Sequence, residues 1–305
     1  MNVQNPSASR GIAIQAIDLV KNYGTGSNMV HALRGVNVSF ERGKFTAIMG
    51  PSGSGKSTLM HTLAGLDSAT SGHILFGGAD LTRMNDKQLT LLRRHKIGFI
   101  FQSFNLLPMF TAEQNILMPL TLAGDKPDRA WFDLLVETLG LKQRLNHRPN
   151  ELSGGQQQRV AIARALITKP KLVFADEPTG NLDSVSSAEV LGFLKRSVNE
   201  LGQTIVMVTH DAVAASYADR AIVFSDGRIV ADEQHPNAEV MNELLMAERE
   251  RTTLTDTPAD QMAQMAGVRN VPDLPITDAP LPPAVPTSGC EGTLRHARAA
   301  ARHAR

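Results

Sequence analysis

One stretch decides the fold: Gly50-Pro51-Ser52-Gly53-Ser54-Gly55-Lys56-Ser57-Thr58, which matches the pattern G-x-x-x-x-G-K-[ST]. A short apolar run precedes it at residues 45–49, and a helix-compatible run follows at residues 56–64 and stops at Gly65. Strand, glycine-rich loop and helix are the context that this motif requires. The sequence therefore predicts a phosphate-binding loop rather than a Gly/Ser-rich turn that happens to contain a lysine.

The residue types of this loop predict its chemistry. Glycines let backbone N–H groups converge on phosphate oxygens, and a helix start adds about half a positive charge. Lys56 is expected to reach the outer phosphates of a triphosphate, Ser57 to be a ligand of the bridging Mg²⁺, and Thr58 to add a phosphate contact.

Length and composition limit the class of protein. The 305 residues are 42% hydrophobic, enough for a real core, and the polar residues 1–11 lack the apolar stretch of a signal peptide. No apolar run approaches the roughly 20 residues needed to cross a bilayer, so a cytoplasmic protein is expected. A net charge of +1 argues against a surface that coats nucleic acid, although not against a local basic patch. The single cysteine, Cys290, excludes an internal disulfide and a multi-cysteine zinc site.

Ahead of the loop, polar and apolar residues alternate. The runs at 12–19 and 31–40 have the period of half-buried strands, and residues 71–78 contain another strand between two turns, which together predict an antiparallel β layer. Tyr23 lies between the first two runs, where its ring either stacks on a nucleotide base or simply packs against the protein.

Behind the loop, the spacing becomes helical. Residues 88–95, 113–123 and 128–139 predict helices, with Pro119 kinking the second, and residues from about 88 to 165 are interpreted as a helical subdomain. A strand-like run at its entrance ends in Gln102, which by itself would be a surface glutamine.

A second anion site is predicted at Leu152-Ser153-Gly154-Gly155-Gln156, which opens a helix that extends to about residue 168. Ser153 occupies the N-cap position, and the glycines leave the first amides of the helix unobstructed. This spacing alone does not exclude an ordinary capped helix.

Two buried strands end in chemically useful residues. The apolar run 172–175 ends in Asp176 and Glu177. Asp176 is well placed to hold Mg²⁺ through water, and Glu177 could polarise an attacking water. The plainer interpretation is a charged strand end. Residues 204–209 form the next buried strand and end in His210, which could sense the terminal phosphate.

The remaining chain contains a hairpin and a tail. Residues 221–231 form the hairpin, a last helix is expected over residues 237–251, and residues 252–305, rich in Pro and Ala with a basic end, are predicted to be disordered. The basic end could form a helix on an anionic surface, but a solvated tail is the preferred interpretation.

In this order, the motifs resemble those of the nucleotide-binding subunits of ABC transporters over residues 11–235, or 11–251 with the last helix. Three longer runs resemble the group of macrolide-export, lipoprotein-release and cell-division ATPases: residues 104–108, 150–165 and 175–183. The resemblance implies an α/β P-loop NTPase core with a mostly parallel sheet, an N-terminal antiparallel β layer and an inserted helical subdomain.

The resemblance also implies roles for single residues. Adenine would lie on Tyr23, the phosphates of ATP on residues 50–58, and Mg²⁺ near Ser57, Asp176 and Gln102. Glu177 would be the general base, and His210 would contact the γ-phosphate.

The resemblance finally implies partners. Two copies would face head to tail, so that Ser153, Gly155 and Gln156 of one close over the ATP of the other, with the loop at Asp183 against the partner. The expected function is an ATPase subunit, peripheral on the inner face of the membrane, that drives a separate membrane permease in export or extraction of a substrate. Open alternatives are an importer subunit, a soluble ABC-type ATPase acting on DNA or ribosomes, and a scaffold that binds ATP without hydrolysing it. Nucleic acid is not an expected partner.

Overall fold

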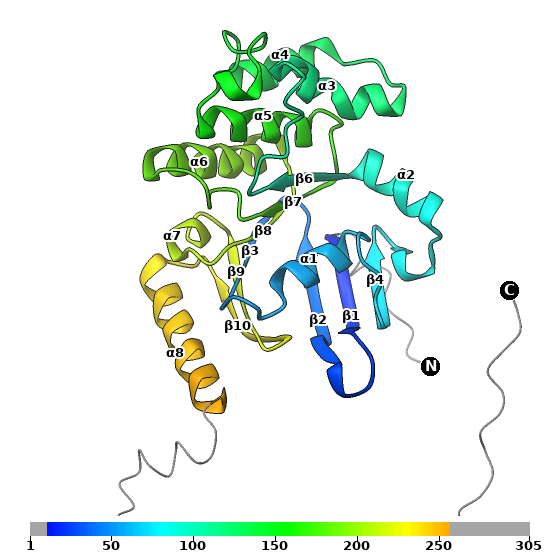
Figure 1. The fold of residues 1–305 in the computed structure, drawn as a ribbon, viewed down its shortest axis with the longest axis vertical. Helices are drawn as coiled ribbons and strands as arrows, with labels where there is room; N and C mark the ends of the chain where they lie inside the picture. The colour runs from blue at the N-terminus through cyan, green and yellow to red at the C-terminus, as the bar shows by residue number, and fades with distance from the viewer. Residues whose placement is uncertain (1–10, 257–305) are drawn as a thin grey trace, which may run out of the picture. The chain divides into compact units, whose positions relative to one another are not determined.

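A six-stranded sheet in the order β10-β9-β3-β8-β7-β6 forms the centre of the computed structural model, which describes residues 11–256 (Figure 1). Its strands are β3 (Phe45–Met49), β6 (Ile97–Phe101), β7 (Leu172–Asp176), β8 (Ile205–Val208), β9 (Arg220–Ser225) and β10 (Arg228–Gln234). All neighbours pair in parallel except β9 and β10, which form the predicted hairpin. The mostly parallel sheet predicted from the apolar runs is confirmed.

Both faces of this sheet are buried, which explains why its strands are continuous apolar runs. Along β7, Val173 and Ala175 belong to one hydrophobic cluster, whereas Phe174 belongs to the other. The first cluster includes side chains of α5 (Gly154–Leu166), α6 (Ser184–Leu201), α7 (Ala212–Ala215) and α8 (Ala238–Asp256). The second contains α1 (Lys56–Leu63) and the N-terminal strands.

The N-terminal strands form a separate antiparallel sheet, as predicted. Its order is β2-β1-β4-β5, with β1 (Ile12–Tyr23), β2 (Val30–Glu41), β4 (Ser71–Phe76) and β5 (Ala79–Asp80). Opposite residues on one face, such as Ile14 with Phe40 and with Phe76, are buried together. Helix α1 packs its apolar side chains into the same cluster, which ties the phosphate-binding loop to both sheets.

The predicted helices of the middle of the chain are present as α2 (Asp86–Lys96), α3 (Ala112–Ala123), α4 (Arg129–Thr138) and α5. Helix α3 runs past Pro119 to Ala123 and ends at Gly124, which adopts the left-handed conformation of a C-cap. Strand β6 interrupts this region and joins the central sheet beside β7, so the residue that follows it lies at the edge where the other parallel strands end.

The end of the described chain differs from the prediction. Helix α8 continues to Asp256, so the boundary predicted at residue 251 falls inside a helix, because the amphipathic pattern weakens before the hydrogen-bonded turns end. Residues 1–10 and 257–305 lie outside the described residues, and with them most of the predicted tail and Cys290. Among residues 11–256, no helix combines the length and the apolar character needed to cross a membrane.

Candidate functional site

The phosphate-binding loop lies between the end of β3 and the start of α1, as its motif requires. Two of its glycines are demanded by the packing: a Cβ on Gly50 would approach the Phe224 carbonyl oxygen to 1.9 Å, and one on Gly55 would approach the Ala32 carbonyl oxygen to 2.5 Å. Gly55 is also the N-cap of α1, with a φ of 103° and no side chain to cap the helix. The first amides of α1 are therefore left for an anion.

Lys56 fills the centre of this loop. Its Nζ donates to the carbonyl oxygens of Gly50, at 2.9 Å, and Pro51, at 2.7 Å. Burial lowers the pKa of this ammonium group, and the carboxylates of Glu177 and Asp176 act in the opposite direction. The buried cation is held only by neutral carbonyl groups among the described residues, an arrangement that suits a bound phosphate.

Asp176 faces the loop from the end of β7. Its Oδ1 accepts a hydrogen bond from Ser57 Oγ at 3.4 Å, and burial raises the pKa of its carboxyl group. The Gln102 side chain packs against Gly180, and its Nε2 donates to Asn181 at 3.3 Å. The amide oxygen of Gln102 is then left as a neutral metal ligand at the same edge of the sheet as Asp176.

The donor set fits Mg²⁺. A hydroxyl, a carboxylate and an amide oxygen are hard ligands of the kind this ion prefers. Within residues 11–256, no group of three or more His, Cys, Asp or Glu side chains could hold a metal without other ligands. The oxygens of Ser57, Asp176 and Gln102 therefore suit an ion that takes its remaining ligands from phosphate and water.

Glu177 and His210 meet at the ends of two adjacent parallel strands. His210 Nδ1 lies 2.8 Å from Glu177 Oε1, and the direction of the proton depends on the histidine tautomer. Glu177 has a φ of 46°, in the left-handed region that non-glycine residues avoid. Such conformations cost of order 1–3 kcal/mol and concentrate at functional sites. Here the conformation comes directly after β7, beside the phosphate-binding loop.

A cavity of about 590 Å³ extends outward from the loop toward Tyr23. The Tyr23 hydroxyl donates to Asp67 Oδ2 at 2.5 Å, and Lys21 Nζ lies 2.6 Å from Asp67 Oδ1 and 4.7 Å from the centre of the tyrosine ring. Asp67 thus positions a ring that is 42% exposed. Sequence reasoning missed this carboxylate and the other walls of the cavity: Met29, Val30, His31, Arg34 and Asp226.

The second predicted anion site is a complete capping box. Ser153 Oγ accepts from the Gln156 amide, and Gln156 Oε1 accepts from the Ser153 amide, at 3.3 and 3.0 Å. A Cβ on Gly155 would lie 2.8 Å from Ser186 Oγ, so packing against α6 is itself a reason for glycine there. None of residues 153–156 lines the cavity around the phosphate-binding loop.

Two further side chains connect the site to the helices: Arg164, whose role was missed from the sequence, and Asp183, which was expected in a loop against the partner. Buried Arg164 donates to the carbonyl oxygens of Phe104 and Asn105, at 2.7 and 2.6 Å, and holds both residues at positive φ just after Gln102. Asp183 caps α6, accepting from Val185 and Ser186 amides at 3.0 Å. The signal for Arg164 was a charged residue at a buried position in the apolar second half of α5.

The sequence model of the family described as "ABC transporter" matches residues 33–180. The chain is 49% identical over 221 residues to the lipoprotein-releasing system ATP-binding protein LolD of Geobacter metallireducens, covering 72% of this chain and 98% of the relative. It is 44% identical to the bacitracin export ATP-binding protein BceA of Halalkalibacterium halodurans, covering 71% and 86%. The macrolide export ATP-binding/permease protein MacB of Bdellovibrio bacteriovorus is 47% identical over 70% of this chain, which spans only 33% of that relative.

Solved structures agree with these matches. The dimeric post-hydrolysis state of the ATP-binding cassette MJ0796, bound to ADP and Pi, has a TM-score of 0.67 at 39% identity and covers 73% of this chain and 99% of that chain. A second dimeric structure of MJ0796, described as a bacterial ABC transporter cassette, gives the same TM-score at 40% identity. At these identities and TM-scores, the chain shares the fold of these cassettes.

Proposed function

The chain belongs to the ABC transporter family as an ATPase, and we propose that two copies close head to tail around two ATP molecules to drive a separate membrane permease. The relatives are proteins of lipoprotein release, macrolide export and bacitracin export, which supports export, or extraction from the membrane, as the direction of work. The protein would then lie on the inner face of the membrane, held there by the permease. The substrate is selected by that partner.

We assign ATP to the cavity at the phosphate-binding loop. The lining of this cavity includes residues 53–58 of the loop and Tyr23. The triphosphate would lie on residues 50–55 and the first amides of α1, with Lys56 on the outer phosphates, Thr58 on an inner one and the base on Tyr23. Ser57, Gln102 and Asp176 would hold Mg²⁺, which supplies neutralisation of charge between the outer phosphates.

Glu177 acts as the general base in this proposal. It would accept a proton from the water that attacks the γ-phosphorus, while the bond to the bridging oxygen of ADP breaks. His210 Nδ1 faces Glu177, which leaves Nε2 for the γ-phosphate. The 2.8 Å contact between these two side chains, at the strained end of β7, is the observation that carries the proposal.

The second copy completes the site. Ser153 Oγ accepts from its own helix, but its hydroxyl proton is still free to donate, and the amides of Gly154 and Gly155 lie at a helix start. Together with Gln156, they would supply donors to the γ-phosphate bound by the other copy. Hydrolysis removes the phosphate link between copies, so the halves would part and pull on the permease.

The permease contact is proposed at the cavity of about 360 Å³ between α2, β6, α3 and α5. Phe99 and Phe101 stack there with ring centres 5.8 Å apart, and Leu122 is 68% exposed at its rim. Gln102 follows β6 directly, so an occupant of this cavity touches the strand that leads to the site. Arg93, Arg94 and Arg164 also line this cavity, so a permease segment that carries apolar and acidic side chains would fit it.

The test is Glu177→Gln. The amide keeps the shape but cannot accept the proton, so ATP turnover is expected to fall by about two to four orders of magnitude with ATP affinity little changed. Turnover and nucleotide binding are measured separately on the full chain, with exposed Glu200→Gln as the matched control. Near-normal hydrolysis by Glu177→Gln would remove Glu177 from the role of base.

A further inference from the structure

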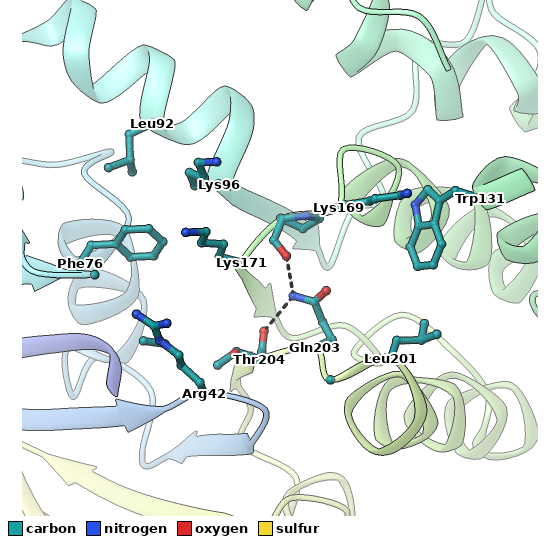
Figure 2. Close-up of a pocket in the computed structure, with 14 residues that line it drawn as sticks. Arg42, Phe76, Leu92, Lys96, Trp131, Lys169, Lys171, Leu201, Gln203 and Thr204 are labelled. Carbon is teal, nitrogen blue, oxygen red and sulfur yellow. Dashed lines mark hydrogen bonds between the residues drawn. The ribbon is translucent and has the colours of Figure 1, made fainter. Parts of the chain in front are cut away.

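A cavity near the opposite end of the parallel strands shares no lining residue with the ATP cavity. It has a volume of about 690 Å³ and lies where β7 and β8 begin, between the end of α2, the β4–β5 turn and the end of α6 (Figure 2). Its walls come from the antiparallel sheet, the helical subdomain and the central sheet. A ligand here would contact all three parts of the described protein.

All the charged residues in the described lining of this cavity are cations. Arg42, Lys96, Lys169 and Lys171 line it, and none of its described lining residues is acidic. The Lys171 amide donates to the Lys96 carbonyl oxygen at 2.9 Å, which brings these two lysines side by side. Figure 2 shows Arg42, Lys96 and Lys171 on the same side of the cavity as Phe76, away from Trp131.

These three cations differ from the fourth in their partners. Lys169 is neutralised by Asp128, at 2.8 Å, and its Nζ lies 5.4 Å from the centre of the Trp131 ring. Arg42 Nε donates only to the neutral carbonyl of Ile12, at 3.1 Å, and in the described part of the chain Lys96 and Lys171 have no carboxylate within 4 Å. Three like charges thus face one concave space without a counter-ion from the protein.

Concave, single-sign charge raises the local concentration of opposite charge. The Arg42 guanidinium is anchored through Nε and packs beside Gly77, where an added Cβ would lie 4.0 Å from its Nη2. That leaves the Nη groups as a fork suited to phosphate, with the two ammonium groups as point charges around it. Gln203 Nε2 donates to the Pro170 carbonyl oxygen at 3.1 Å, and the amide oxygen of Gln203 points away from Arg42 and Lys171.

We propose that this cavity is a second anion site, distinct from the ATP site, that binds a small molecule carrying two or more phosphate groups between Arg42, Lys96 and Lys171. Its volume is that of a small-molecule site. An occupant of this site would contact both the antiparallel sheet and the helical subdomain.

The test uses inorganic tripolyphosphate as the probe and the full chain with saturating ADP, so that the phosphate-binding loop is occupied. Trp131 is the only tryptophan of the chain, and it lines this cavity but not the ATP cavity. A saturable change in tryptophan fluorescence is expected, with a matching binding isotherm by calorimetry. No binding beyond ADP would overturn the proposal.

Charge-reversal variants locate the binding. Lys96→Glu and Lys171→Glu are each expected to weaken tripolyphosphate binding at least tenfold, while Lys87→Glu, an exposed position on the same helix as Lys96, leaves it unchanged. ADP affinity stays the same in all three, which separates this site from the proposed ATPase. If Lys87→Glu weakened tripolyphosphate binding equally, the effect would come from the general surface charge, and the proposed site would be wrong.

A last arm identifies the source of the phosphates. Inositol hexakisphosphate and vesicles of phosphatidylcholine, with and without a phosphatidylinositol bisphosphate, are titrated against the Trp131 signal. Binding of the soluble probe assigns a free ligand, whereas a signal from phosphoinositide vesicles alone assigns a lipid headgroup to the same three cations. A signal from phosphatidylcholine alone would overturn phosphate recognition.

Discussion

Helices α1 and α5 both begin at a predicted phosphate site, but their first turns are built differently. Helix α1 starts from Gly55 in the left-handed region, without a side-chain cap, and encloses a buried ammonium group. Helix α5 starts from Ser153, whose own side chain satisfies the Gln156 amide. The first site is left open for a ligand within its own chain, whereas the second is closed on itself until something approaches from outside.

The capping box alone does not make an anion site. Helices α2 and α3 begin with the same device, Asn85 with Gln88 and Thr111 with Gln114. What distinguishes α5 is the glycine pair after the cap, of which Gly155 is also required by the approach of Ser186. In the proposed dimer, this difference means that the start of α1 binds a nucleotide, whereas the start of α5 contacts the nucleotide that a second chain already holds.

The largest effect is expected from Lys56→Ala, which would break the first site only. Removing the buried cation should weaken ATP binding by at least about 100-fold and reduce turnover to background, because charge-assisted contacts to phosphate are lost. Equilibrium binding of a fluorescent ATP analogue and a phosphate-release assay measure both. Exposed Lys44→Ala, at the other end of β3, is the control and should behave as the parent. Retained ATP affinity in Lys56→Ala would mean that the start of α1 does not need its buried ammonium group to bind ATP, which would contradict the contrast drawn with α5.

Ser153→Arg would break the second site and leave the first intact. Monomer ATP binding should persist within about twofold, while the ATP-dependent dimer is lost and turnover falls by about 100-fold, because a large side chain now lies where the partner's phosphate would be. The dimer is followed on a sizing column in the Glu177→Gln background.

Loss of a cap alone costs about 1 kcal/mol, so a control must lose one too. Asn85→Arg removes the equivalent capping box from α2, and it should lower the melting temperature similarly but keep the dimer. An undiminished dimer in Ser153→Arg would sink the shared-site proposal.

The smallest effect concerns buried charge, which the first site carries and the start of α5 lacks. Burial raises the pKa of Asp176, so the folded, ligand-free protein disfavours its ionised form. At a pH below the pKa values of both the folded and the unfolded state, the Asp176 carboxyl is neutral in both states and does not affect stability. As the pH rises above the pKa of the unfolded state, ionisation favours unfolding of the parent protein, whereas Asp176→Asn has no such group to ionise. The variant should melt about 2 °C higher at pH 7, a shift of less than about 1 kcal/mol, with no difference near pH 3.

The melting curves are measured with chelator and without nucleotide, so that neither ligand offsets the buried charge. Asp133→Asn, at an exposed position of α4, should leave the melting temperature unchanged at both pH values. A lower melting temperature for Asp176→Asn at pH 7 would mean that the carboxylate stabilises the empty site, and the contrast in buried charge would be wrong.

Much of the fold followed from local patterns. Continuous apolar runs indicated strands buried on both faces, and alternation indicated the half-buried antiparallel layer. Successive side chains of a strand point to opposite faces, so the pattern of apolar residues shows whether one face or both are buried. The boundary of α8 did not follow, since frayed helix ends leave little trace in composition.

The candidate site was predictable in its parts and not in its contacts. Gly50 to Thr58, Asp176, Glu177 and His210 each stood out at a loop or strand end. That Glu177 meets His210 depends on β7 and β8 being neighbours in the sheet, which strand order decides. Asp67, which orients Tyr23, and Arg164, which holds the loop after Gln102, act on partners distant in sequence.

By itself, the sequence determined which residues can bind phosphate, because glycine conformations, helix starts and a lysine at fixed spacing act within a few residues of one another. Only the tertiary structure decided how those residues are used. It left the start of α1 open, closed the start of α5 with its own cap, paired Glu177 with His210, and gathered three uncompensated cations at the far end of the strands. The physical reason is that such arrangements come from strand order and packing between distant segments, where local sequence carries no information about the partner.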